Sequence, residues 1–210
     1  PPYEIENGYE RIIELGEKTL REITINFPLY SNVRELYIGL SEDAVIDDSV
    51  PYKIEQPIVY YGSSITQGGC ASRPGNSYPS IISRKFNCDY INLGFSGNAK
   101  GENEIADYIK NLDMSIFVYD YDYNAETVKQ LKDTHERMFK TIRNENPDLP
   151  IILMPRPKYI LSKEEKERIN VIETTYQNAL DSGDKNVYFV SSETLMQFAK
   201  NEGTVDNCHP

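Results

Sequence analysis

The chain has 210 residues, 39% of them hydrophobic and 26% charged, and its 33 acidic residues outnumber its 22 basic ones to give a net charge of −11. Such an acidic surface disfavours nucleic acid and anionic membranes, because both require a protein that supplies positive charge. No apolar run approaches the roughly 18 residues that a membrane-spanning helix needs. The composition therefore predicts a globular protein with neither a nucleic-acid nor a membrane partner.

Residues 1–56 are predicted to be a β-rich segment. Apolar and polar residues alternate over residues 24–27 and 33–38, which is the period of strands with one solvent-exposed face. Pro28 and an acidic stretch at residues 42–48 separate these runs. Because so few apolar side chains make such a segment marginal on its own, we expect it to dock on the following domain as part of a β-sandwich.

From residue 57 onward, short apolar runs alternate with helical periodicity. Continuous apolar runs suit strands buried on both faces, as in a parallel sheet. They occur at residues 58–61, 90–93, 115–119, 151–154 and 187–190. Helical patterns follow at residues 78–86, 105–112, 128–142, 162–180 and 193–201. This alternation predicts an α/β fold over residues 57–210, a three-layer α/β/α sandwich with a five-stranded parallel sheet.

Polar residues follow the predicted strands at the edge where parallel sheets bind ligands. They are Gly62-Ser63-Ser64, Gly94–Asn98, Asp120–Asn124, Arg156 and Asp206–Pro210. This set contains each group that acyl transfer requires, namely a hydroxyl nucleophile, a general base, a carboxylate that orients the base, and donors for an oxyanion. The sequence therefore indicates acyl-transfer chemistry at this edge.

Each of these residues also has a structural interpretation. A serine after a strand, such as Ser64, is most often a turn hydroxyl. Gly97 could serve only to adopt a positive φ, and Asn124 only to cap a helix. The spacing of Asp206 and His209 could be accidental. What favours the catalytic interpretation is the occurrence of all these features, in order, at predicted strand ends.

Four segments resemble the sequence blocks of the SGNH (GDSL-type) esterases and acylhydrolases. Gly62-Ser63-Ser64-Ile65 resembles their Gly-Asp-Ser-Leu block, and Asn92–Gly97 resembles the second block. Asp120–Asn124 is similar to the third block, and Asp206-x-x-His209-Pro210 to the last. The resemblance covers residues 57–210 and implies the flavodoxin-like fold of this family. It is closest to bacterial members with a small β-domain in front, which residues 1–56 would represent in part.

The resemblance implies a role for each matching residue. Ser64 would be the nucleophile, His209 the general base, and Asp206 the carboxylate that orients the imidazole. The backbone N–H groups of Ser64 and Gly97 and the side-chain amide of Asn124 would form the oxyanion hole. These roles are chemically consistent, because a serine hydroxyl needs a neighbouring base and histidine titrates near neutral pH.

Two features depart from the family pattern. Ser63 stands where the family name implies Asp, although this side chain is not the nucleophile. The sequence ends at Pro210, directly after the base, whereas family members continue into a closing helix. We therefore expect residues 57–210 to form the hydrolase domain without that helix, and either the sequence is a shortened form of the chain or another segment must hold the loop that carries His209.

Other reactive residues have structural interpretations. His135 lies on a predicted helix, away from the strand ends. Asp120 and Asp122 are too close in sequence to flank a glycosidic bond, and a metal site built on them is the less favoured alternative. Cys70 and Cys208 are interpreted as pocket-lining thiols rather than as a disulfide.

Arg73, Tyr78 and Tyr123 are the predicted substrate-binding residues, because tyrosine rings with polar tips suit sugars. No long apolar segment separates the blocks, which argues against long acyl chains. We therefore expect a serine esterase that hydrolyses a short acetyl ester, on a carbohydrate. Two alternatives stay open, a short-chain phospholipid (platelet-activating-factor-like) acetylhydrolase and a non-catalytic carbohydrate-binding protein that retains the pocket.

The sequence also bears on cofactors, partners and cellular location. Three cysteines and two histidines are too few for a disulfide framework or a His/Cys zinc cage, so we expect no metal and no cofactor. The expected partner is the ester substrate, and a homo-oligomer is left open. No basic-then-apolar leader opens the chain, which slightly favours the cytoplasm, while a start at Pro1 without Met leaves a removed leader open.

Overall fold

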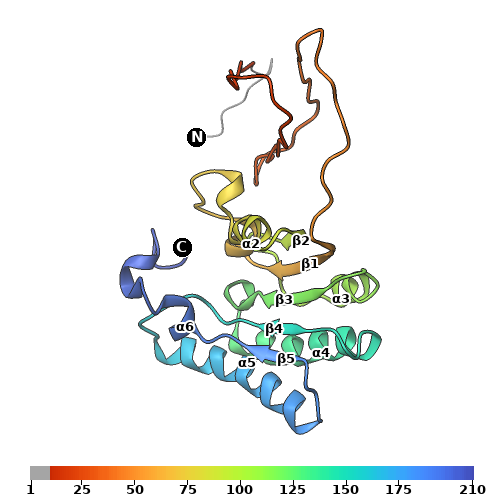
Figure 1. Ribbon diagram of the computed structural model, residues 1–210. Helices are drawn as coiled ribbons and strands as arrows, with labels where there is room; N and C mark the ends of the chain where they lie inside the picture. Colours follow the sequence, from red (N-terminus) through yellow and green to blue (C-terminus); the bar gives the residue numbers. More distant parts are fainter. Residues whose placement is uncertain (1–9) are drawn as a thin grey trace.

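A five-stranded parallel sheet organises the chain from residue 54 onward (Figure 1). The structure, a computed structural model, describes residues 10–210. The strands are β1 (Ile54–Gly62), β2 (Cys88–Gly94), β3 (Ile116–Asp120), β4 (Ile151–Leu153) and β5 (Val187–Phe189), in the order β2-β1-β3-β4-β5. The strand order reverses at β1, whose neighbours are β2 and β3. Open parallel sheets bind ligands where the order reverses, beyond the carboxyl ends of the strands. The five predicted strands are therefore confirmed, and the sheet directs attention to the loops after β1 and β3.

The helices at residues 78–86, 103–109, 128–145, 163–181 and 192–196 overlap the predicted ranges, whereas the short helix at residues 64–67 was not predicted. In chain order the helices are α1 (Ser64–Gln67), α2 (Tyr78–Phe86), α3 (Asn103–Ile109), α4 (Val128–Glu145), α5 (Lys163–Asp181) and α6 (Ser192–Met196), with single 3₁₀ turns η1 (Pro74–Asn76), η2 (Asp122–Asn124) and η3 (Lys200–Gly203). The Ser162 side chain caps α5 and the Glu165 side chain reaches back to the Ser162 backbone, a capping box that satisfies two free N–H groups. The helix expected over 193–201 is shorter, because α6 ends at Met196, and the φ of +50° at Lys200 excludes an α-helix that continues through residue 201.

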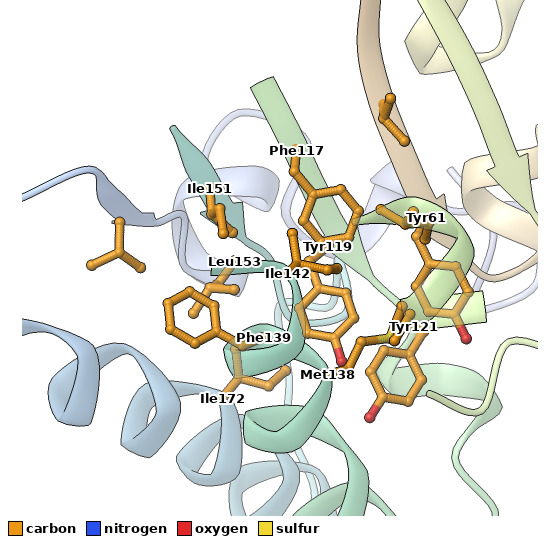
Figure 2. Close-up of a cluster of buried hydrophobic side chains, with 14 of the residues drawn as sticks. Tyr61, Phe117, Tyr119, Tyr121, Met138, Phe139, Ile142, Ile151, Leu153 and Ile172 are labelled. Atoms are coloured by element: carbon orange, nitrogen blue, oxygen red, sulfur yellow. The ribbon is translucent and has the colours of Figure 1, made fainter. Parts of the chain in front are cut away.

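Helices cover the two faces of the sheet unequally. On one face, α3, α4 and α5 pack their apolar sides against alternate strand residues in a cluster that includes four fully buried aromatic side chains (Figure 2). These are Tyr61, Phe117, Tyr119 and Tyr121. On the other face, a smaller cluster joins strand residues such as Tyr60 and Val118 to Tyr78 and Ile82 of α2. The three-layer sandwich is confirmed, and its second outer layer is formed mainly by α2.

The N-terminal segment differs from its prediction. Between residues 10 and 53 the structure assigns no strand, so the strands expected at 24–27 and 33–38 are not formed. The residues in these two runs are exposed. Strands do not form here because a strand needs a hydrogen-bonded neighbour, and none of the described residues provides one. The segment instead runs as an extended chain on the side of the molecule where α2 lies (Figure 1). The assignment of 1–56 to a separate domain stays a prediction, and residues 1–9 lie outside the described residues.

None of the helices within residues 10–210 combines the length and the apolar character that crossing a membrane would require.

Candidate active site

Ser64 lies at the tip of the first strand-to-helix turn. Gly62 ends β1 where no side chain fits, because a Cβ there would overlap the Asp120 carbonyl and the Thr66 hydroxyl. The buried Ser63 side chain accepts a hydrogen bond from the Ile65 backbone N–H at 3.2 Å and caps α1. Capping is a role that Asp and Ser share, which gives a physical reason why Ser stands at this position. Ser64 follows as the first residue of α1, at the carboxyl edge of the sheet.

The C-terminal loop brings His209 to Ser64. The Ser64 Oγ lies 2.7 Å from His209 Nε2, and His209 Nδ1 lies 2.7 Å from Asp206 Oδ2. Because Nδ1 faces a carboxylate it carries the ring proton, which leaves Nε2 as the acceptor for the serine hydroxyl. A backbone hydrogen bond from Val205 N–H to the His209 carbonyl, at 2.9 Å, closes the loop. The terminal position of His209 is thus held by contacts within the loop and by Ser64.

Asp206 is fixed by its own loop. Its Oδ1 accepts the backbone N–H groups of Cys208 at 3.0 Å and His209 at 2.7 Å. The hydrogen bonds that His209 donates, from its backbone and from its ring, lower the pKa of Asp206 to about 2. The carboxylate is therefore ionised at neutral pH and can stabilise a positive charge on the imidazole.

The three N–H groups predicted to form the oxyanion hole have no hydrogen-bond partner among residues 10–210: the backbone N–H groups of Ser64 and Gly97 and the Nδ2 amide of Asn124. Gly97 has a φ of +72° in the loop after β2, where a Cβ would strain the backbone. The Asn124 Oδ1 accepts the Ala99 N–H at 3.3 Å, which occupies the oxygen end of the amide and leaves its NH₂ end as the free donor. The three residues predicted for the oxyanion hole thus each retain an unused donor.

A hollow of about 480 Å³ adjoins two of these donors. Gly97 and Asn124 line it together with charged side chains from the segment after η2, the loop after β4 and the start of α5, among them Glu126, Arg156 and Glu164. Tyr123 also lines it, with the Arg156 guanidinium 4.2 Å from its ring centre. Burial raises the pKa of the Tyr123 hydroxyl. The lining is rich in groups that bind hydroxyls and poor in aliphatic side chains.

The other two residues predicted to bind substrate are placed differently. Tyr78 is a core residue, because its ring packs edge-on against Tyr60 at 5.5 Å and its hydroxyl donates to Thr66 Oγ1 at 3.4 Å. Its position after the nucleophile turn suggested that it would line a pocket, but α2 packs this side chain against a face of the sheet. Arg73 is exposed just before η1, and its side chain makes neither a hydrogen bond nor an ion pair with the described residues.

The carboxylates after β3 have structural partners. Asp122 accepts hydrogen bonds from Arg156 Nε and Nη2, the latter at 2.6 Å, and lies 3.9 Å from the Arg168 guanidinium. Two arginines thus neutralise this buried charge, which accounts for it without a metal ion. Asp120 is buried and accepts a hydrogen bond from Thr66 Oγ1 at 3.1 Å. Burial raises the pKa of Asp120 to about 7.

His135 lies inside the core rather than near the sheet edge. It is 1% exposed, its Nδ1 is 2.8 Å from Thr175 Oγ1, and its ring stacks on Tyr119. Burial lowers the pKa of His135 to about 3, so this side chain is neutral and packs as an aromatic ring.

Sequence reasoning missed a contact between the N-terminal segment and the nucleophile turn. Leu29, which is less exposed than its neighbours, packs against Gly68, and the Tyr30 hydroxyl donates to the Ser64 carbonyl at 3.4 Å. Gln67 joins the same region, because its amide donates to the Leu29 carbonyl at 2.8 Å and accepts the Ser96 N–H at 2.9 Å. Pairings over such sequence separations leave no local pattern, so only the folded chain reveals them.

Comparisons with known proteins place the chain in a family. The model of the GDSL-like lipase/acylhydrolase family matches residues 55–210. A Bacteroides ovatus ATCC 8483 protein, described as a GDSL-like lipase, is 36% identical with a TM-score of 0.77, over 88% of this chain and 56% of that one. This chain thus spans little more than half of that protein. The search of curated proteins found no match.

Two more distant structures share the fold alone. One is a family two carbohydrate esterase from Clostridium thermocellum, with 18% identity, a TM-score of 0.53, and coverage of 68% of this chain and 55% of that chain. The other is a two-domain esterase active on acetylated mannans, with 20% identity, a TM-score of 0.54, and coverage of 74% and 44%. Because the family model extends over most of the chain and a 36% identical structure matches 88% of it, the protein belongs to the GDSL-like lipase/acylhydrolase family.

Proposed function

We propose that this protein is a serine esterase in which Ser64, His209 and Asp206 form the catalytic triad. The observation that carries the proposal is the pair of 2.7 Å contacts that join the serine hydroxyl to the imidazole and the imidazole to the carboxylate. A nucleophile, a base and an orienting group in hydrogen-bond reach of one another are the arrangement that acyl transfer needs. Family membership supports the same chemistry.

The geometry accounts for each step of hydrolysis. His209 Nε2 takes the Ser64 proton as Oγ attacks the ester carbonyl, and Asp206 stabilises the imidazolium that forms. The carbonyl π electrons move to its oxygen, which the free donors of Ser64, Gly97 and Asn124 stabilise. When the tetrahedral intermediate collapses, the C–O bond to the alcohol breaks and His209 returns the proton to the leaving oxygen. A water activated by His209 then attacks the acyl-serine, the acid leaves, and Ser64 regains its proton.

The substrate that fits best is a short acyl ester, with acetyl preferred, of a hydroxyl-rich alcohol such as a carbohydrate. The hollow beside Gly97 and Asn124 presents carboxylates and guanidinium groups that can hydrogen-bond to hydroxyls. A long acyl chain would have to lie against these charges and leave them desolvated, which costs free energy. The carbohydrate esterases that share the fold are consistent with this choice.

The test is hydrolysis of p-nitrophenyl acetate and p-nitrophenyl octanoate by the purified chain and by Ser64→Ala. We expect turnover of acetate to exceed that of octanoate and to fall by at least about a thousandfold in the variant, since loss of a nucleophile leaves only binding and oxyanion effects. Equal rates for the two proteins would overturn the esterase proposal. Faster hydrolysis of octanoate would overturn the short-acyl assignment and favour a lipase-like enzyme. Release of acetate from acetylated cello- and manno-oligosaccharides then tests the carbohydrate part.

A further inference from the structure

Cys70 lies beside two residues of the proposed triad and takes no part in the chemistry described above. Its Sγ, a carboxylate oxygen of Asp206 and a ring nitrogen of His209 all lie within 4.8 Å of one another. Cys70 is exposed and its thiol is free. A soft sulfur donor thus stands next to the imidazole and carboxylate of the triad.

Backbone contacts hold this cluster together from two loops. The Gly69 N–H donates to the Ser64 carbonyl at 2.6 Å, which fixes the residue before Cys70 to the nucleophile turn. Gly69 also abuts the imidazole, because a Cβ on it would lie 2.9 Å from His209 Cδ2. On the other side, the Asp206 carboxylate is held by the N–H groups of its own loop. The three donors are therefore neighbours because both backbones are anchored.

The donor set has the composition that zinc prefers. Zn²⁺ binds thiolate sulfur, imidazole nitrogen and carboxylate oxygen, whereas Mg²⁺ and Ca²⁺ select oxygen donors alone. We propose that Cys70, Asp206 and His209 bind a zinc ion, and that the bound ion inhibits the enzyme. The inhibitory part rests on the function proposed above, whereas binding itself does not.

The distances are compatible with a three-ligand site. Zinc bonds of about 2.0 to 2.3 Å in a tetrahedron place the ligand atoms about 3.3 to 3.8 Å apart. The cluster has an upper separation of 4.8 Å, so a contraction of at most about 1.5 Å suffices. Rotation of the exposed Cys70 and Asp206 side chains can supply it. A water molecule would complete the tetrahedron, and the thiol would release its proton to solvent on binding.

Zinc at this position removes the base from the reaction. A ring nitrogen whose lone pair is bound to the metal cannot accept the Ser64 proton. If the metal takes Nε2, it occupies the nitrogen that faces Ser64; if it takes Nδ1, it displaces the hydrogen bond to Asp206. Either mode blocks proton transfer, so the site would switch hydrolysis off in response to free zinc.

The experiment measures the half-inhibitory zinc concentration for p-nitrophenyl acetate hydrolysis, each protein being compared with its own zinc-free rate. We expect inhibition of the wild type that is reversed by EDTA. In Cys70→Ser the half-inhibitory concentration should rise by at least about tenfold, because the strongest of three ligands is lost. Cys208→Ser is the matched control, since it removes a thiol adjacent to His209 in sequence that is not part of the cluster.

Calorimetric titration of zinc chloride into Ser64→Ala, with and without Cys70→Ser, measures binding without catalysis. We expect one zinc per chain in the first protein and at least about tenfold weaker binding in the second. The zinc proposal is overturned if neither protein binds zinc, if both bind it equally, or if Cys208→Ser rather than Cys70→Ser relieves inhibition. Cys70-dependent binding to a protein without esterase activity would instead refute the proposed function and leave the site standing. An active esterase that zinc does not affect would refute the zinc proposal and leave the proposed function standing.

Discussion

Asp206 contacts His209 through both of its carboxylate oxygens. Oδ2 lies 2.7 Å from the ring Nδ1, while Oδ1 accepts the backbone N–H of the same residue, also at 2.7 Å. One side chain thus sets both the tautomer of the imidazole and the shape of the loop that carries it. Because the pKa of Asp206 is lowered to about 2, this arrangement is maintained throughout the neutral range.

Asp206→Asn should separate these two roles. Asn can still accept the backbone N–H with its Oδ1, but its NH₂ group cannot accept the Nδ1 proton, so the ring would favour the tautomer with a proton on Nε2. We expect kcat for p-nitrophenyl acetate to fall by about two to four orders of magnitude, as when an orienting carboxylate is lost from a triad. The thermal unfolding midpoint should change little, which the same preparation can show. A loss of less than about tenfold would argue against Asp206 as the orienting group.

Asn124→Ala tests the oxyanion donors. Its Nδ2 would stabilise charge that develops only in the transition state, so we expect kcat to fall by about 10²- to 10³-fold with little change in KM. Asn98→Ala is the matched control, because Asn98 lies in the neighbouring loop and, within residues 10–210, its side chain donates only to the Ser96 carbonyl at 2.8 Å. Equal losses in the two variants would mean that the loops respond to any truncation, and Asn124 would lose its proposed role.

Leu29→Ala tests the contact between the N-terminal segment and the nucleophile turn. Leu29 packs on Gly68, four residues after Ser64, so truncation should loosen the turn and lower kcat/KM by about threefold to tenfold. Leu40→Ala, at an exposed leucine of the same segment, should leave the rate unchanged. The measurement is the steady-state kcat/KM of both variants. If Leu29→Ala behaves like Leu40→Ala, the segment has no influence on the site.

Asp120 should make the stability of the fold depend on pH. Its pKa is raised from 3.8 to about 7 by burial, so the folded state binds a proton that the unfolded state has already lost between these values. The free energy of unfolding should therefore fall as pH rises from about 4 to 7, by at most about 1.4 kcal/mol per pH unit.

Asp120→Asn removes this titration. Urea unfolding of both proteins at several pH values between 4 and 8 gives the difference in their unfolding free energies. We expect the variant to gain stability relative to the wild type as pH rises. A difference that does not change with pH would show that Asp120 titrates normally in the folded protein.

Much of the fold was predictable because its signals are local. The inner strands β1, β3 and β4 are mostly buried and form apolar runs, and each main helix carries its own periodicity. The helix start at Ser162 could likewise be predicted, because a capping box involves residues only three apart. The spacing of Asp206 and His209 is equally short, which is why the loop that joins them is recognisable in the sequence.

The N-terminal segment shows where local patterns fail. Alternation over residues 24–27 and 33–38 is compatible with strands, but a strand forms only against a hydrogen-bonding neighbour, which no short stretch of sequence specifies. The same limit explains Tyr78, whose place after the nucleophile turn suggested a pocket wall. The path of α2 places its ring against Tyr60 instead.

What the amino-acid sequence determined by itself was therefore the set of strands and helices and the order of the chemically active residues along them. Only the tertiary structure decided which of these residues meet. It placed Ser64 within 2.7 Å of a histidine 145 positions away, paired Asp122 with Arg156, and set Cys70 beside His209. The physical reason is that secondary structure arises from interactions within a few residues, whereas such contacts depend on sheet order and loop path, which belong to the chain as a whole.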